Sequence, residues 1–355
     1  MFRVQLEKWY GTFGRDLPWR KTRDPYLIML SEFILQQTQI CQGTDYYIRF
    51  AERFPTAESL AEASEEKVMR LWQGLGYYSR ARHLHAAAKQ IAEAGHFPRD
   101  YAFVRALPGV GDYTAAAIMS FAFGEPYAVL DGNAQRVLAR HFGITEPVDT
   151  TQGRKLFRAL ADEMLDTTHP ALYNQAIMDF GALQCKPSGP LCDTCPLAES
   201  CLALREHQVD KLPVKSKRTA VRDRYLTYIY TRTRDGQTLI HRRGSGDIWQ
   251  GLFEFPLIES DKPLQVAEVE QQMPDGKLEL IARDVRHQLT HQRLHADFYC
   301  LTLPHTNNEM GNGTLLSPGH QPEREKWANG KWIDETSLER YALPRLLEKL
   351  LEKMK

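Results

Sequence analysis

Apolar residues in the first two hundred positions recur every three or four residues, in short blocks separated by polar and turn-forming residues. This spacing places apolar side chains along one face of a helix. The blocks with this spacing are residues 27–40, 58–72, 80–94, 114–123, 133–141 and 171–184. We therefore predict that the first half of the chain is all-helical.

The pattern changes after residue 206. Residues 207–222 are polar and basic without an apolar stripe, which is typical of an exposed linker. Beyond them, β-branched and aromatic residues gather in runs that predict strands, and the chain closes with an amphipathic helix. The predicted strands are 225–232, 236–243 and 296–303, and the predicted helix is 343–354. We predict a mainly α domain over 1–206, a linker, and an α+β domain over 223–355.

The composition fits two globular domains, because 355 residues suffice for two separate cores. Lys+Arg and Asp+Glu both number 45, so the net charge is zero and no broad basic field favours nucleic acid. Binding to DNA would have to rest on backbone amides and a few placed cations. No stretch reaches the roughly 18 apolar residues of a membrane span, and the first residues, MFRVQLEKWY, lack the apolar h-region of a signal peptide. We expect a soluble monomer of the bacterial cytoplasm that binds no membrane.

Four cysteines crowd into residues 185–201 with the spacing C-x6-C-x2-C-x5-C: Cys185, Cys192, Cys195 and Cys201. Structural zinc usually takes two close pairs, whereas only the middle two cysteines form one here. A compact loop around a 4Fe-4S cluster suits this pattern better. Zinc and paired disulfides remain alternatives. Cys41 and Cys300 stand apart, and we predict that they are free thiols.

The segment ALPGVGDYTAAAI (106–118) has the sequence of a helix-hairpin-helix. Its glycines permit a tight turn, and its alanines allow the second helix to pack closely. Backbone N–H groups of Gly109 and Gly111, at the start of that helix, can converge on a phosphate oxygen without a cationic side chain. The alternative is an ordinary turn between two helices.

Two carboxylates are candidates for chemistry. Glu32 is the one acid in an otherwise uncharged helical segment, where apolar surroundings raise a carboxyl pKa and keep a proton to donate. Asp131 precedes a helix, and the helix start favours its ionised form. Opposed environments of this kind suit the acid and the stabiliser that break a glycosidic bond. The alternatives are a buried salt bridge for Glu32 and a simple N-cap for Asp131.

The motifs together resemble the adenine DNA glycosylase (MutY) family, within the endonuclease III superfamily of helix-hairpin-helix glycosylases. They are LPW (17–19), LSEFILQQTQ (30–39), LWQGLGYYSRAR (71–82), LPGVGDYTAAAI (107–118), LDGNAQRVLAR (130–140), NQAIMDFGALQC (174–185) and the cysteine loop. The resemblance runs from about residue 5 to the end of the chain. It implies double-stranded DNA as the partner, and hydrolytic removal of adenine mispaired with 8-oxoguanine or guanine.

The resemblance also implies roles for individual residues. Glu32 aligns with the general acid that protonates adenine N7, Asp131 with the carboxylate that stabilises the oxocarbenium ion or forms a transient adduct, and Asn133 with a residue that supports it. Tyr113 stands where relatives that cut the strand carry a Schiff-base lysine, so we expect little or no lyase activity.

Residues that contact DNA are implied in the same way. Gln37 and Tyr77 align with residues that wedge into the duplex around the lesion, and a wedge is needed because the adenine must leave the stack. Half-buried packing is the default interpretation of Tyr78. Lys186 lies where a phosphate contact would be useful, and a merely solvated lysine is the alternative.

The second half resembles the Nudix-like domain that recognises 8-oxoguanine in the same family. Its landmarks are RRG (242–244), IWQGLFEFP (248–256) and WI (332–333). The acidic box of Nudix hydrolases is missing, so Mg²⁺-dependent pyrophosphate cleavage is not expected. The family typically shows Phe-Ser-His where this chain has Leu289, Thr290 and His291. Thr290 and His291 can still hydrogen-bond to the lesion, whereas Leu289 cannot stack as a ring would.

Three other functions compete with adenine excision. An endonuclease III-like glycosylase for pyrimidines or mismatched thymine would share the hairpin and the cysteines, but it would not explain the tyrosine at position 113 or the second domain. A non-catalytic DNA-binding module would not need Glu32 or Asp131. A Nudix pyrophosphatase would need the missing acidic box.

Overall fold

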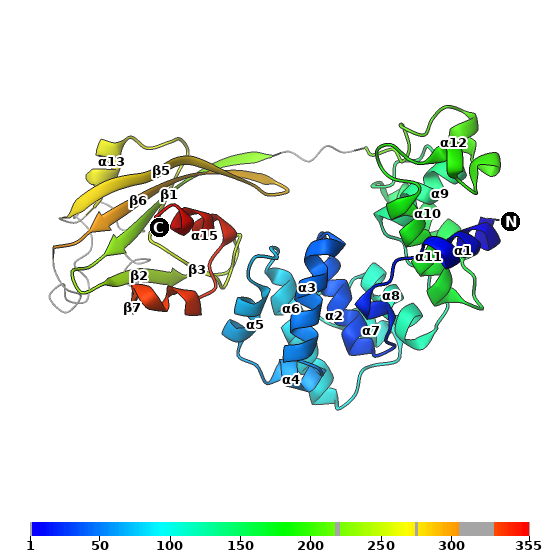
Figure 1. Ribbon diagram of the computed structural model, residues 1–355, viewed down its shortest axis with the longest axis horizontal. Coiled ribbons are helices and arrows are strands. Elements are labelled where there is room, and N and C mark those ends of the chain that lie inside the picture. The colour runs from blue at the N-terminus through cyan, green and yellow to red at the C-terminus, as the bar shows by residue number, and fades with distance from the viewer. Residues whose placement is uncertain (1, 217–220, 274–275, 305–329, 355) are drawn as a thin grey trace. The chain divides into compact units, whose positions relative to one another are not determined.

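The computed structural model describes residues 2–216, 221–273, 276–304 and 330–354. Contacts divide the chain into two compact units. Unit 1 comprises Met1–Ala63 with His83–Arg218, and unit 2 comprises Ser64–Arg82 with Thr219–Lys355. Figure 1 shows the elements of both units. No helix within the described ranges is long and apolar enough to cross a membrane.

Unit 1 is helical, as predicted. Its elements are α1 (Phe2–Phe13), η1 (Pro18–Arg20), α2 (Pro25–Leu35), α3 (Ile40–Arg53), α4 (Ala57–Ala61), most of α6 (Ser79–Ala94), α7 (Tyr101–Ala106), α8 (Asp112–Phe123), α9 (Gly132–His141), α10 (Thr151–Met164), α11 (Pro170–Leu183), η2 (Cys192–Thr194), η3 (Ala198–Ser200) and α12 (Leu202–Arg205). Side-chain caps start several of these helices, among them Asp24 before α2 and Asp131 before α9.

Two predicted helical blocks end earlier or break. The block 27–40 ends at Leu35, because the chain turns before Gln39 and starts a new helix at Ile40. The block 58–72 breaks into α4 and α5 (Glu65–Trp72), because the Ser64 side chain accepts the Lys67 N–H and so begins a second helix.

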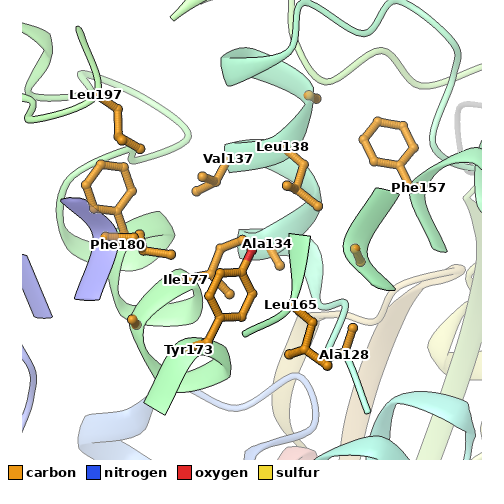
Figure 2. Close-up of a cluster of buried hydrophobic side chains, with 14 of the residues drawn as sticks. Ala128, Ala134, Val137, Leu138, Phe157, Leu165, Tyr173, Ile177, Phe180 and Leu197 are labelled. Carbon is orange, nitrogen blue, oxygen red and sulfur yellow. The ribbon is translucent and has the colours of Figure 1, made fainter. Parts of the chain in front are cut away.

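A large core cluster of unit 1 lies around α9 and α11 (Figure 2). Figure 2 shows Val137 and Leu138 of α9 among rings and aliphatic chains from α10 and α11, including Phe157 and Phe180. These side chains are buried, so together they fix the axis of α9 against α11. The residue that caps α9 is Asp131, and the core therefore sets its position.

The stretch 207–216 is not the exposed linker that its polarity predicted. Leu212 is only 3% exposed, and Val209 and Val214 pack partly against the core of unit 1. The Val148 N–H donates to the Val214 carbonyl, and Arg140 Nε donates to the Leu212 carbonyl. The prediction was wrong here because three scattered apolar residues anchor a segment of turns and irregular backbone without forming a periodic stripe. Residues 217–220 lie outside the described ranges.

Unit 2 contains two sheets, ordered β4-β1-β6-β5 and β3-β2-β7. The elements are β1 (Arg222–Arg232), β2 (Gln237–Arg242), β3 (Phe253–Glu254), β4 (Leu257–Ser260), α13 (Val266–Glu270), β5 (Lys277–Gln288), β6 (Gln292–Thr302), β7 (Lys331–Asp334), η5 (Glu335–Arg340) and α15 (Arg345–Glu352). The strands β1 and β6 run parallel, whereas β5 and β6 form an antiparallel hairpin. This is the α+β architecture predicted from the sequence.

Alternation along β1 separates two cores in unit 2. Tyr228 and Tyr230 face a cluster that includes Leu346 and Leu350 of α15, while Ile229 faces a cluster that includes Val269 of α13. Neighbouring residues of a strand point to opposite faces, so one strand serves both clusters. The amphipathic helix predicted near the C-terminus is α15, and its buried leucines cover one face of the four-stranded sheet.

The segment Ser64–Arg82 groups with unit 2 rather than with the other helices. It contains α5 and the first residues of α6. Arg242 Nη2 forms an ion pair with Glu65 Oε1 at 2.9 Å, and Arg82 donates to the Gln250 carbonyl. The domain bounds drawn from the sequence stay a prediction.

Candidate active site

Unit 1 contains a cavity of about 440 Å³. Its lining comes from η1, α2, α8, the start of α9, and α11. Glu32, Tyr113, Asp131 and Asn133 all line it. The structure therefore brings together in one cavity the four residues that the sequence singled out for catalysis, although they are up to 101 positions apart in the chain.

Glu32 is placed by α2, the most apolar helix of unit 1. Asp24 caps this helix by accepting the N–H groups of Tyr26 and Leu27, and almost every later residue of α2 is buried. Glu32 is buried with them and is 5% exposed. Its carboxyl group nevertheless reaches the cavity. A lone acid in an apolar helix is thus the signal that located this residue.

Burial raises the pKa of Glu32 to about 7. The Tyr113 hydroxyl donates a hydrogen bond to this carboxylate and opposes the rise, as does the charge of Arg20. The negative charge of Asp131 raises the pKa further. A carboxyl group with this pKa holds a proton in a substantial fraction of molecules near neutral pH, as a general acid must.

Asp131 caps α9 and also lines the cavity. Its Oδ1 accepts the Ala134 N–H at 2.7 Å, and its Oδ2 accepts Nδ2 of Asn133 at 2.7 Å. We expected the helix start to favour the ionised form. Burial acts in the opposite direction and is the larger effect, so the pKa of Asp131 is raised despite these hydrogen bonds. The N-cap and the candidate catalytic group are therefore the same carboxylate.

Asn133 is held by a partner that the sequence did not reveal. Arg136 Nη2 donates to Asn133 Oδ1 at 2.9 Å and to the Gly181 carbonyl, while its Nε donates to the Cys185 carbonyl at 2.8 Å. A Cβ on Gly181 would lie 2.6 Å from that of Asn133. Only the i, i+3 spacing of Asn133 and Arg136 could have suggested this contact.

A second group that the sequence did not identify lies in the cavity wall. Arg15 and Arg20 line the cavity, and both bind Asp179 of α11, which is 0% exposed. The two arginines flank the LPW motif and Asp179 lies within NQAIMDFGALQC. The motifs were therefore visible in the sequence, but the ion pairing between segments 159 and 164 positions apart was not.

The predicted hairpin joins α7 to α8. Gly109 has a φ of 75° and is exposed, and a Cβ there would lie 2.6 Å from that of His83. Gly111 is the N-cap of α8, has no side chain to cap it, and is exposed as well. Tyr113 follows two residues later and faces the cavity. One helix start thus presents backbone N–H groups to solvent and a phenol to the cavity.

The two predicted wedge residues have left-handed backbones. Gln37 has a φ of 56° and is exposed directly after α2. Tyr77 has a φ of 46° and is 46% exposed, with its hydroxyl 2.7 Å from that of Thr290. Non-glycine residues in this region are strained, and such strain gathers at functional sites. Tyr78, in contrast, is buried, in agreement with the packing interpretation.

The predicted recognition loop is the turn between β5 and β6. The Leu289 N–H donates to the Gln292 carbonyl at 2.8 Å and closes the turn. Thr290 and His291 are exposed at its tip, whereas Leu289 packs partly against the core of unit 2. The loop therefore offers a hydroxyl and an imidazole outward and keeps its aliphatic side chain inward.

The four cysteines lie between the end of α11 and the start of α12. All four are free thiols and half-buried, so the disulfide alternative does not hold in this structure. Burial raises the pKa of Cys195 to about 11, and negative charge on the other three cysteines adds to the rise. Arg140 Nη1 donates to Cys185 Sγ at 3.4 Å. No group of three or more His, Cys, Asp or Glu in the described ranges is arranged to hold a metal ion.

Lys186 follows the first cysteine and is half-buried. Its carbonyl accepts a hydrogen bond from Arg140 Nη1 at 2.7 Å. Arg140 Nη2 also donates to the carbonyl of Pro187. The backbone of this residue therefore belongs to the cysteine loop, and its phosphate contact stays a prediction.

Comparison with known proteins decides the family. Residues 30–162 match the HhH-GPD superfamily of base excision DNA repair proteins, and residues 227–353 match the NUDIX domain. The adenine DNA glycosylase of Buchnera aphidicola subsp. Baizongia pistaciae is 32% identical over 83% of this chain and 84% of its own length. The chain belongs to the adenine DNA glycosylase family. It is therefore a base excision repair glycosylase, an enzyme that hydrolyses N-glycosidic bonds. The family resemblance seen in the motifs is confirmed.

Other members of the family differ in length. A relative from Buchnera aphidicola subsp. Schizaphis graminum is 29% identical over 99% of this chain and 98% of its own length. The mouse adenine DNA glycosylase is 38% identical over 74% of this chain but only 52% of its own length. The chain thus matches about half the length of the mouse relative, and nearly the whole of this bacterial one.

Solved structures resemble the helical part. A thermostable thymine-DNA glycosylase is 30% identical, with a TM-score of 0.54 over 58% of this chain and 95% of that chain. A non-covalent complex of endonuclease III with DNA has a TM-score of 0.51 at 21% identity, which supports the fold alone. The endonuclease III-like fold predicted from the hairpin and the cysteine loop is therefore confirmed.

Proposed function

We propose that the protein hydrolyses the N-glycosidic bond of adenine mispaired with 8-oxoguanine or guanine in double-stranded DNA. One observation carries this proposal. A buried carboxyl group with a pKa of about 7 and a second carboxylate held at a helix start line the same cavity. Membership of the adenine DNA glycosylase family supports adenine as the base that is removed.

Glu32 and Asp131 divide the chemistry. Glu32 delivers its proton to N7 of an extruded adenine, and the electrons of the C1′–N9 bond then leave with the base. Asp131 stabilises the positive charge that develops on the sugar, either through space or as a transient ester. A water molecule then bonds to C1′, and its proton passes to a carboxylate. Tyr113 and Asn133 hold the two carboxyl groups in place through their hydrogen bonds.

We further propose that the enzyme leaves the abasic strand largely uncut. Strand cleavage by this route needs an amine that attacks C1′ to give a Schiff base. The residue at the relevant position is Tyr113, a phenol, and no lysine lines the cavity among the described residues. Hydrolysis is then the route that the lining supports.

DNA contacts are assigned from the exposed groups. Backbone N–H groups at Gly109 and Gly111 bind a phosphate oxygen at the start of α8, where a helix favours an anion. Gln37 and Tyr77 wedge into the duplex, and Lys186 contacts a phosphate. Thr290 and His291 hydrogen-bond to the lesion base. The exposure of the hairpin, of the wedge residues and of the loop tip supports these roles.

We also propose that Cys185, Cys192, Cys195 and Cys201 hold a 4Fe-4S cluster. The donor set fits, because four free thiols lie between the end of α11 and the start of α12, and thiolates are the ligands of such clusters. The spacing of the four cysteines, with a single close pair, favours the cluster over the zinc alternative. Such a cluster would supply a structural link between the end of α11 and α12. Arg140 would offset part of the thiolate charge through its contact with Cys185.

The test uses the pure protein and labelled duplexes. Adenine is placed opposite 8-oxoguanine, guanine or thymine, and a fourth duplex carries thymine opposite guanine. Alkali then reveals abasic sites, and borohydride traps any Schiff base. We expect abasic sites only in the first two duplexes, and no trapped adduct. Release of thymine but not of adenine would instead support the thymine-specific alternative, which the solved thymine-DNA glycosylase brings into consideration.

A further inference from the structure

Asp179 is a completely buried carboxylate with two cationic partners, Arg15 and Arg20. It is 0% exposed and lies on α11. Arg15 donates to it through its backbone N–H at 2.9 Å, through Nε at 2.8 Å and through Nη2. Arg20 donates through Nη1 and Nη2, both at 2.7 Å. These hydrogen bonds lower the pKa of Asp179 despite its burial, so it is an anion.

Both arginines belong to the cavity wall, where Glu32 and Asp131 also lie. Of the two arginines, Arg20 is the one whose charge lowers the pKa of Glu32. A buried ion cluster contributes little stability in itself, since desolvation offsets the attraction of the charges. The cluster therefore calls for an explanation beyond folding.

We propose that Asp179 is a positioning residue for base excision, one that fixes Arg15 and Arg20 in the cavity wall and offsets their charge beside Glu32. The proposal rests on the proposed function, because it assumes that Glu32 is the acid. Asp179 acts through the arginines, since its oxygens are occupied by them. No contact between Asp179 and the base is required.

Positive charge close to the reacting bond opposes the transition state. The reaction places a proton on the base and positive charge on the sugar, and uncancelled guanidinium groups nearby would oppose both. They would also favour the ionised form of Glu32, which cannot donate. The anion of Asp179 reduces both effects. It keeps the planar donors of Arg20 fixed at the same time.

Other groups around Glu32 set the background for this test. The charged and titratable ones are Arg15, Arg20 and Arg23 from the N-terminal segment, Tyr113 from α8, Asp131 at the start of α9, and Asp179 from α11 behind the arginines. Asp179 and Arg20 have opposite signs, so their removal must shift the titration of Glu32 in opposite directions. A cluster that only tethers the N-terminal segment to α11 would produce no such pattern.

The experiment compares the wild type with Asp179→Asn, Arg20→Gln and the double variant. Single-turnover adenine release is measured against pH, and the titration of Glu32 is followed by carboxyl ¹³C NMR with Glu32→Gln as the assignment reference. In Asp179→Asn the falling limb of the rate and the Glu32 titration should move to lower pH, by about half a unit or more. In Arg20→Gln they should move to higher pH, and the double variant should return toward the wild type.

Matched variants separate positioning from loss of structure. Phe157→Leu weakens the core of unit 1 without touching the cavity. It should therefore lower the free energy of unfolding and leave the falling limb of the pH–rate profile at the same pH. Asp179→Glu keeps the charge and should restore most of the limb position. If Asp179→Asn does not fold, Arg20→Gln still has to raise the pH at which Glu32 titrates.

Two outcomes overturn the proposal: folded variants with an unmoved Glu32 titration, or single variants that shift it in the same direction. Failure of the proposed function looks different, because the wild type itself would then release no adenine. The NMR titration does not depend on activity, so it decides the role of Asp179 even in that case.

Discussion

The cavity of unit 1 and the β5–β6 turn of unit 2 hold their polar groups in opposite ways. Glu32 and Asp131 are largely removed from water, and both of their pKa values are raised. Thr290 and His291 are exposed at the tip of a turn. Burial shifts the pKa of a group and makes its chemistry depend strongly on its neighbours. An exposed group can contact a binding partner, and its substitution disturbs little of the surrounding structure. Substitutions should therefore reduce activity strongly in the cavity and only slightly in the turn.

The largest effect is expected for Glu32→Gln. An amide cannot deliver the proton that adenine N7 needs, so single-turnover release should fall by about 10²–10⁴-fold, the usual contribution of a general acid. Binding to the duplex should persist, as measured by fluorescence anisotropy. Turnover near the wild-type rate would remove Glu32 from the mechanism.

The same substitution should stabilise the protein at alkaline pH. The pKa of Glu32 is raised from 4.5 to about 7 in the folded state. The favourable contribution of its protonated form is thus fully present below pH 4.5 and is lost as pH rises through 7. Above pH 7 the wild type should be less stable than Glu32→Gln by roughly 3 kcal/mol. Urea unfolding at pH 4 and pH 8 measures the difference, which should nearly vanish at pH 4.

A smaller effect is expected for Gly181→Ala, which tests how rigidly the cavity is built. The added methyl group would meet Asn133 at 2.6 Å, so α9 has to shift. We expect a loss of about 1–3 kcal/mol in unfolding free energy and a loss of about tenfold or more in adenine release, since displaced catalytic groups are costly. Gly11→Ala is the matched control, because open space surrounds that glycine in α1. Equal behaviour of the two variants would contradict the tight packing at Asn133.

The smallest effect is expected in the turn. The double variant Thr290→Ala, His291→Ala loses exposed hydrogen-bonding groups, each of which contributes about 1 kcal/mol. The preference for adenine opposite 8-oxoguanine over adenine opposite guanine should fall by about tenfold, with stability unchanged. Parallel single-turnover assays on the two duplexes give the ratio. An equal loss on both would show that the turn does not read the lesion.

The sequence could predict whatever depends on local spacing. Helical periodicity predicted the first half, a run of β-branched and aromatic residues predicted β1, and a lone acid in an apolar segment located Glu32, because each signal lies within one element. The hairpin glycines were predictable for the same reason, whereas the turn with Thr290 and His291 was located through the family resemblance.

What could not be predicted depends on contacts between distant segments. The sequence does not show that Asp179 meets Arg15 and Arg20, since the partners lie about 160 residues away. The raised pKa of Asp131 was also hidden, because the local helix start and the global burial act in opposite directions and only the folded cavity sets their balance. Both cases concern charge in a buried place, where distant residues decide the outcome.

The docked stretch 207–216 determines where the helical half can be separated from the rest of the chain. A truncation after Glu206 would follow the change in sequence pattern, yet it would strip Leu212 from the core and leave Arg140 without one of its carbonyl acceptors. A truncation after Ser216 would retain both, as well as the Ser216 N–H that donates to Asp149. The ten residues that look most dispensable are thus the ones that an isolated glycosylase fragment should keep.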